Sequence, residues 1–133
     1  MSNTSSDTPR ALYLNGEWKN PGTALEVTNP STGEVIGSVS TIDRAGTRQA
    51  IADAEAAWAG WKGLTGKDRG AYLNAIADEI EKRADEIGRT ISLENGKPLP
   101  QGKGEVGMSV DHFRWYAEEA RRTYGRVIPH QMD

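Results

Sequence analysis

The feature that most constrains this chain is the stretch Leu93–Pro100 (LENGKPLP), which separates two long segments of helical periodicity. Asn95 and Gly96 tolerate a left-handed backbone, so they can close a helix at its C-terminal end. Pro98 prevents that helix from continuing, whereas Pro100 suits the first turn of a new helix. The stretch therefore predicts a sharp connection between two helices.

Helical spacing of apolar residues recurs on both sides of this connection. The first helix is expected to begin after Asp43, a candidate N-cap, and to end in the region bracketed by Gly60 and Gly63. A second helical segment begins at Thr65, which together with Asp68 resembles a capping box. It continues to the connection either as one long helix or as two helices with a break near Asp85.

The same spacing identifies the side chains that these helices should bury. In the first helix they are Ile51, Ala54 and the tryptophans Trp58 and Trp61. In the second segment they are Leu73, Ile76, Ile80, Ala84, Ile87 and Ile91. In the last helix, which Gly125 should end, they are Val106, Val110, Phe113, Ala117, Ala120 and Tyr124. In the second segment, charges of both signs occupy the opposite face, as is typical of a solvated helix face.

Three glycines, Gly102, Gly104 and Gly107, occupy the first turns of the last helix. Each costs up to about 1 kcal/mol relative to alanine, so the first residue of this helix stays open. With the residues between them they match the dinucleotide fingerprint G-x-G-x-x-G. That fingerprint works after a buried parallel strand, which the proline-rich residues before Gly102 cannot form. A free-standing dinucleotide binder is therefore an alternative that we expect to fail.

The N-terminal third of the chain predicts short antiparallel strands. In Leu12–Lys19, the Asn-Gly pair at positions 15 and 16 can supply both positive-φ positions of a two-residue hairpin turn. Leu25–Pro30 alternates apolar and polar side chains, as a half-buried strand does, and residues 35–39 supply a return strand. Residues 1–10 are small and polar and are expected to form a flexible N-terminal arm.

The composition excludes several classes of protein. The formal net charge of −3 argues against a broad nucleic-acid surface, because such a surface needs clustered Lys and Arg. The chain contains no cysteine, so it has no disulfide, no thiolate metal site and no cysteine nucleophile. No apolar run approaches the roughly 20 residues of a membrane helix. We therefore expect a cytoplasmic protein that binds neither nucleic acid nor membranes.

The hydrophobic fraction of 36% is low for an autonomous domain of 133 residues, since apolar residues including glycine usually make up about 45–50% of a globular domain. This deficit suggests elements that pack against something else, such as more chain. The two histidines, His112 and His130, have no metal-ligand spacing around them. No residue stands out as a nucleophile.

With these elements in place, the chain resembles the N-terminal portion of an aldehyde dehydrogenase. The resemblance covers about residues 11–130 and rests on four strings in the family's order. These strings are Leu12–Trp18 (LYLNGEW), Asn29–Val35 (NPSTGEV), Leu93–Leu99 (LENGKPL) and Phe113–Ala120 (FRWYAEEA), the last followed by Tyr124-Gly125. The last two strings are closest to the succinate-semialdehyde dehydrogenase branch.

This resemblance implies an α/β fold, namely the N-terminal part of an aldehyde dehydrogenase cofactor domain, with short antiparallel strands followed by three or four helices. Residues 11–133 would form a segment of the nucleotide-binding domain, and the catalytic domain would be absent. The parent enzyme would be a homo-oligomer that oxidises succinate semialdehyde, or a similar short aldehyde, to the acid with NAD or NADP. Its cysteine nucleophile would come later in the chain, so the 133-residue chain should be inactive and bind no cofactor tightly.

The resemblance also implies a structural site for a monovalent cation, sodium or potassium. By position, its ligands in this chain would be the backbone oxygens of Val27 and Thr28 and the carboxylate of Glu94. Hard cations prefer such oxygen ligands, and further oxygens would come from beyond residue 133. The alternative is that Glu94 is an ordinary solvent-facing carboxylate.

A different class of function also fits the residues. The chain could be a truncated small helical module for binding or interaction, without catalysis. Such a module would need a partner that covers the exposed apolar sides of its helices.

Overall fold

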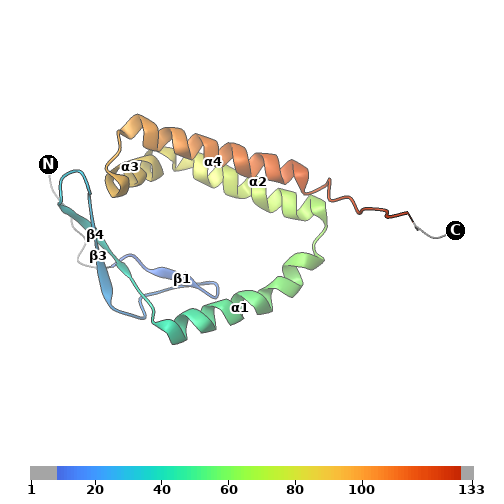
Figure 1. The fold of residues 1–133 in the computed structure, drawn as a ribbon, viewed down its shortest axis with the longest axis horizontal. Helices are drawn as coiled ribbons and strands as arrows, with labels where there is room; N and C mark the ends of the chain where they lie inside the picture. The colour runs from blue at the N-terminus through green and yellow to red at the C-terminus, as the bar shows by residue number, and fades with distance from the viewer. Residues whose placement is uncertain (1–8, 130–133) are drawn as a thin grey trace.

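The computed structural model describes residues 9–129, which form two antiparallel hairpins followed by four helices (Figure 1). The α/β class and the order of elements agree with the sequence expectation. The strands are β1 (Leu12–Leu14), β2 (Glu17–Lys19), β3 (Ala24–Thr28) and β4 (Val35–Ser40). The helices are α1 (Arg44–Gly63), α2 (Gly66–Lys82), α3 (Ala84–Asn95) and α4 (Leu99–Glu119).

The first hairpin has the predicted two-residue turn. Asn15 has φ 50° and Gly16 has φ 81°, so both central residues are left-handed and match the twist of the flanking strands. The rings of Tyr13 and Trp18, which face each other in the register, lie 5.2 Å apart.

The expected N-terminal arm lies mostly outside the described residues, which begin at residue 9. Its last residue, Arg10, pairs with β4. The Arg10 N–H donates to the carbonyl of Ser38, and the Ser40 N–H donates to the carbonyl of Arg10, both at 2.9 Å. Arg10 is thereby attached to the second hairpin.

The second hairpin, β3–β4, is the longer of the two. Its turn is stabilised by the Asn29 side chain, whose Oδ1 accepts a hydrogen bond of 2.9 Å from the Ser31 N–H. Gly33 completes the turn with φ 75°. The register is interrupted between Val27 and Thr28, where a β-bulge locally disrupts the ladder.

The helix starts agree with the predicted caps. The Asp43 carboxylate accepts a hydrogen bond of 2.8 Å from the Gly46 N–H at the start of α1. The Thr65 hydroxyl accepts a bond of 3.1 Å from the Asp68 N–H at the start of α2. Of the two expected alternatives the structure has two helices. The break between α2 and α3 falls at Arg83, close to Asp85, which lies in the first turn of α3.

The connection between α3 and α4 has the predicted geometry. Gly96 is left-handed, with φ 67°, and its N–H donates to the carbonyl of Ser92. Pro98 is extended, and Pro100 lies in the first turn of α4. Helix α4 begins at Leu99, ahead of all three glycines, so its first residue, which the sequence left open, is now defined.

Helix α4 lies alongside α2 and packs on α3, and the close approach depends on glycines (Figure 1). A Cβ atom at Gly70 of α2 would lie only 2.6 Å from the carbonyl oxygen of Ala117 in α4. A Cβ atom at Gly102 would come still closer to the carbonyl oxygen of Gly88 in α3. Hydrogen alone fits at these crossings, so the helix backbones touch.

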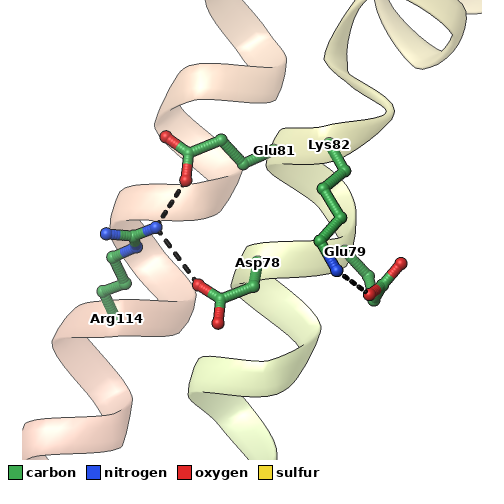
Figure 2. A network of polar contacts seen from close by, with 5 residues as sticks. All are labelled: Asp78, Glu79, Glu81, Lys82 and Arg114. Carbon is green, nitrogen blue, oxygen red and sulfur yellow. Dashed lines mark hydrogen bonds and ion pairs between the residues drawn. The ribbon is translucent and has the colours of Figure 1, made fainter.

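Helices α2, α3 and α4 together form one layer, called here the helical layer. The buried apolar residues of the described chain belong to it. They are Ala77, Val106, Val110 and Ala117. At the edge of the layer the guanidinium of Arg114 in α4 contacts Glu81 at 2.6 Å and Asp78 at 3.4 Å, both from α2 (Figure 2). A separate pair, Lys82 and Glu79, stays within α2 on the side away from Arg114 (Figure 2).

Five expectations about buried residues are wrong. In α1, Ile51 is 62% exposed and Ala54 is exposed as well. Trp58 is 56% exposed, and α1 as a whole has no buried residue. Trp61 is half-buried, and the centre of its ring lies 5.7 Å from that of Tyr72.

The other two wrong expectations lie outside α1. Ile76 is exposed on α2. The last helix ends at Glu119 and not at Gly125 as expected, so Tyr124 lies beyond it and is 82% exposed.

Candidate functional site

The turn of the second hairpin rests on the connection between α3 and α4. The Ser31 hydroxyl donates a hydrogen bond of 2.8 Å to the carbonyl oxygen of Gly96. A Cβ atom at Gly96 would lie 2.6 Å from Ser31 Oγ and 3.0 Å from Pro30 Cγ. Gly96 is therefore required twice, for its positive φ and for this contact. The connection between α3 and α4 therefore contacts the turn of the β3–β4 hairpin in addition to joining the two helices.

A small cavity of about 70 Å³ lies between this hairpin and α3. Val27 and Glu94, two of the three residues expected to hold a cation, both line it. Thr28 lies outside the cavity lining and is exposed. The fold thus brings together residues that are 67 positions apart in the sequence, from Val27 to Glu94.

Two residues that line this cavity have the kinds of oxygen expected of the cation site, the backbone carbonyl of Val27 and the carboxylate of Glu94, and Glu94 is exposed. The volume of the cavity exceeds the roughly 10–15 Å³ that one water-sized particle needs. The bulge beside Val27 interrupts regular pairing there, and carbonyl and carboxylate oxygens are what hard cations prefer. Among the described residues there is no group of three or more His, Cys, Asp or Glu side chains that could hold a metal ion. Arg10 also lines the cavity and brings a competing positive charge.

An ion pair beside the connection is a feature that the sequence analysis missed. Lys97 Nζ lies 2.5 Å from Glu105 Oε1, and the Lys97 side chain is only 24% exposed. The Ser92 hydroxyl also donates to the carbonyl oxygen of Lys97. These contacts tie the connection to both flanking helices. Lys97 precedes α4, so helical spacing could not have indicated its pairing with Glu105.

A second ion pair joins α3 to α4 directly. Lys103 Nζ lies 2.6 Å from Asp85 Oδ1, and the bond to Lys103 lowers the pKa of the Asp85 carboxyl below its usual value. The guanidinium of Arg83, at the junction of α2 and α3, likewise lowers the pKa of Glu86 in the first turn of α3. Both carboxylates are exposed, and the pairs position helices. They are not arranged as acid–base catalysts.

The glycine fingerprint at Gly102–Gly107 lies inside α4. Gly102 is buried against Gly88, whereas a Cβ atom at Gly104 or Gly107 would meet nothing within 4 Å. Both sheets of the described chain are two-stranded and antiparallel, so no parallel strand leads into the motif. In this structure the first glycine makes a helix contact, and the match to a cofactor loop is coincidental.

The remaining polar features of residues 9–129 do not converge on a catalytic centre. His112 is exposed on α4, and His130 lies outside the described residues. A groove of about 510 Å³ between the start of α2 and the end of α4 is lined by Lys67, Arg121 and Arg122, together with Glu118. Arg122 is paired with Glu119 at 2.7 Å. Across residues 9–129, no helix is both long and apolar enough to cross a membrane.

Comparisons with known proteins agree on one relationship. Residues 18–133 match the aldehyde dehydrogenase family. The chain is 44% identical over 124 residues to a glutarate-semialdehyde dehydrogenase of Pseudomonas putida, with 91% of this chain and 26% of that protein covered. It is 41% identical over 123 residues to an NADP(+) succinate-semialdehyde dehydrogenase of Escherichia coli, with 90% and 26% covered.

The structural comparison gives the same picture. The crystal structure of a succinate-semialdehyde dehydrogenase from Burkholderia pseudomallei superimposes with a TM-score of 0.84 at 35% sequence identity. The superposition covers 97% of this chain and 28% of that one. The chain therefore spans about a quarter of the length of the relatives that it matches.

Proposed function

The chain belongs to the aldehyde dehydrogenase family, and we propose that it is the N-terminal segment of an NAD(P)-dependent semialdehyde dehydrogenase. The parent enzyme would oxidise succinate semialdehyde, or a similar short aldehyde such as glutarate semialdehyde, to the acid. The observation that carries this proposal is the 44% and 41% identity, over about nine tenths of the chain, to relatives named for those two substrates.

The segment's contribution in this proposal is architectural. It contains no cysteine, and aldehyde oxidation by way of a thioester needs a thiolate nucleophile, so the nucleophile must come from the rest of the parent. An apolar groove of about 340 Å³ runs along α2 and α3, lined by Tyr72, Ile76, Ile80 and Ile87. Burying such surfaces is the main source of folding free energy. We expect the remainder of the parent to cover this groove.

The direct test is an activity assay on the protein made from the complete reading frame. NADH or NADPH formation with succinate semialdehyde or glutarate semialdehyde is expected, and the 133-residue chain should give none. Comparing the two substrates and the two cofactors would define the specificity that this segment leaves open. Absence of turnover with both semialdehydes and both cofactors would overturn the proposal.

The exposed groove also favours a second candidate, a small helical interaction module. The two candidates differ in the reading frame beyond Asp133. A reading frame that continues and encodes a cysteine supports the enzyme, whereas a frame that stops there supports the module. In the second case a separate protein partner would have to cover the apolar groove.

Val27, Thr28 and Glu94 are proposed as part of a structural site for sodium or potassium in the parent. The shared cavity of Val27 and Glu94 supports this assignment. In the whole protein, potassium or sodium chloride should raise the midpoint of thermal unfolding above that in choline chloride at equal ionic strength. Glu94→Gln should remove this difference, whereas Glu55→Gln, on the exposed side of α1, should retain it. Equal midpoints in all three salts would contradict the site.

The proposal carries two further expectations from the family resemblance, a homo-oligomeric parent and a cytoplasmic location. Light scattering of the whole protein measures its mass in solution, and a monomer would contradict the first. Cell fractionation tests the second.

A further inference from the structure

Two Asn-Gly pairs occur in the described chain, and the fold holds them very differently. Asn15-Gly16 forms the tip of the β1–β2 hairpin, and Asn95-Gly96 ends α3. Asparagine before glycine is chemically labile, because the glycine nitrogen can attack the side-chain carbonyl carbon without obstruction by a side chain of its own. Whether it does so depends on how firmly the pair is held.

The reaction is a spontaneous deamidation that needs only water. At the first pair, the Gly16 nitrogen gives up its proton to a base and forms a bond to Cγ of Asn15. The bond from Cγ to Nδ2 breaks, and Nδ2 takes up a proton returned by the base and leaves as ammonia. Water then opens the resulting succinimide at either carbonyl and yields aspartate or isoaspartate. No oxidation or reduction occurs.

The first pair is weakly held. Asn15 and Gly16 are both exposed, and a Cβ atom at Gly16 would meet nothing within 4 Å. Among residues 9–129, no backbone carbonyl accepts a hydrogen bond from the Gly16 N–H. The hairpin has only three residue pairs, and an isolated two-stranded hairpin is marginally stable in water. The tip can therefore open to the geometry that the attack requires.

The second pair is held by three hydrogen bonds. The Gly96 N–H, which would have to be the nucleophile, donates to the carbonyl of Ser92. Asn95 Nδ2 donates to the carbonyl of Ile91 at 3.1 Å. The carbonyl of Gly96 accepts from the Ser31 hydroxyl at 2.8 Å. Both the nucleophile and the leaving group are thus engaged in the helix cap.

We propose that Asn15 is a site of spontaneous deamidation and that the cap of α3 protects Asn95 from the same reaction. Conversion of Asn15 places a new carboxylate beside Glu17. Isoaspartate also lengthens the backbone by a methylene group, so the Leu14–Glu17 pair loses its register. Ageing of the protein then opens the first hairpin and leaves the helical layer unchanged.

The test is peptide mapping by mass spectrometry of the whole protein, aged at mildly alkaline pH. Asn15 should convert at least about tenfold faster than Asn95, because reaction at a hydrogen-bonded amide requires local opening. In concentrated urea the two rates should agree within about twofold, since the unfolded chain holds neither pair. Equal rates in the folded protein, or an unchanged ratio in urea, would overturn the proposal.

Two controls sharpen this test. Asn29 precedes Pro30, which has no N–H, so it cannot react by this route and serves as an internal negative control. Ser31→Ala removes the hydrogen bond to the Gly96 carbonyl and should accelerate reaction at Asn95 while leaving the rate at Asn15 unchanged. An unchanged Asn95 rate in this variant would contradict the protection that we assign to the cap.

Discussion

The helical layer of α2, α3 and α4 and the N-terminal part, formed by the two hairpins and α1, are built on different principles. Within residues 9–129, every buried apolar residue belongs to the helical layer, whereas α1 buries none. In the same range the only buried residue of the hairpins is the polar Ser40, whose hydroxyl donates to Asn20 at 2.7 Å. The layer is held by packing between its helices. The N-terminal part is held mainly by turns, caps and strand pairing, and its second hairpin contacts the α3–α4 connection through Ser31.

This difference shows what glycine does in each region. In the hairpins Gly16 and Gly33 supply positive φ angles to turns. In the helical layer Gly70 and Gly102 have ordinary helical backbones and serve by lacking a side chain at a crossing. The first use depends only on the local backbone, whereas the second depends on the partner helix. Substitutions in the two regions should therefore have different effects on stability.

The largest effect is expected from a methyl group at the α3–α4 crossing. Gly102→Ala places its Cβ against the carbonyl oxygen of Gly88, and such overpacking should lower the free energy of unfolding by about 3 kcal/mol. The measurement is urea unfolding followed by helical circular dichroism. Gly104→Ala is the matched control on the same helix. Its Cβ meets nothing, so it should raise the stability by about 0.5–1 kcal/mol. A stabilising Gly102→Ala would refute the close crossing.

Truncation of the buried core comes next. Val106 is 1% exposed, and Val106→Ala removes two methyl groups and leaves a cavity, which should cost about 2 kcal/mol. Val127 is 94% exposed, so Val127→Ala should change the stability by less than about 0.5 kcal/mol. The same urea unfolding compares the two variants. Similar losses in both would mean that residue 127 is buried in solution.

Removing the N-cap of α1 or of α2 should show whether α1 unfolds together with the helical layer. Thr65→Ala should lower the unfolding free energy of the helical layer by about 1 kcal/mol. Asp43→Ala should instead reduce the helicity of α1 without moving the urea midpoint of the layer, because an unpacked helix depends on local interactions. Amide hydrogen exchange resolves the two helices. A shift of the whole midpoint by Asp43→Ala would show that α1 unfolds together with the layer.

The smallest effects concern two exposed ion pairs, one in each region. Lys103 lowers the pKa of Asp85 across the α3–α4 contact, and Lys19 lowers the pKa of Glu17 within β2. Because the folded pKa lies below the unfolded value of about 4, each contribution is present above that pH and is lost as the pH falls through the folded pKa. Carboxyl titration by NMR should show that Lys103→Met restores the pKa of Asp85 and leaves that of Glu17 unchanged. Lys19→Met should have the reciprocal effect.

Residues with strong local preferences made much of the fold predictable. Asn15-Gly16, Asp43, Thr65 and the Gly96–Pro98 pair each act within a few residues of the backbone, and the structure confirms all of them. The sequence left open whether α2 and α3 are one helix or two, because they join almost continuously at Arg83. Helix boundaries carry weak signals when no glycine or proline marks them.

The candidate site was predictable only in part. Val27 and Glu94 were assigned through the family resemblance, and the structure places both on one cavity. The ion pair of Lys97 with Glu105 has no periodic signal, since it joins a loop residue to the second turn of a helix. The exposure of Trp58 could not be foreseen either, because hydrophobic spacing reports an apolar face but not whether anything covers it.

The sequence by itself determined the order of the elements, their turns and caps, and the family to which the chain belongs. These properties depend on φ preferences, on side chains that bond to nearby backbone, and on matching strings of residues. Only the tertiary structure decided which glycines serve crossings and which serve turns, and which apolar faces are buried. Burial and close approach depend on residues distant in the chain, such as Gly88 and Gly102 or Gly70 and Ala117, whose contact no local pattern encodes.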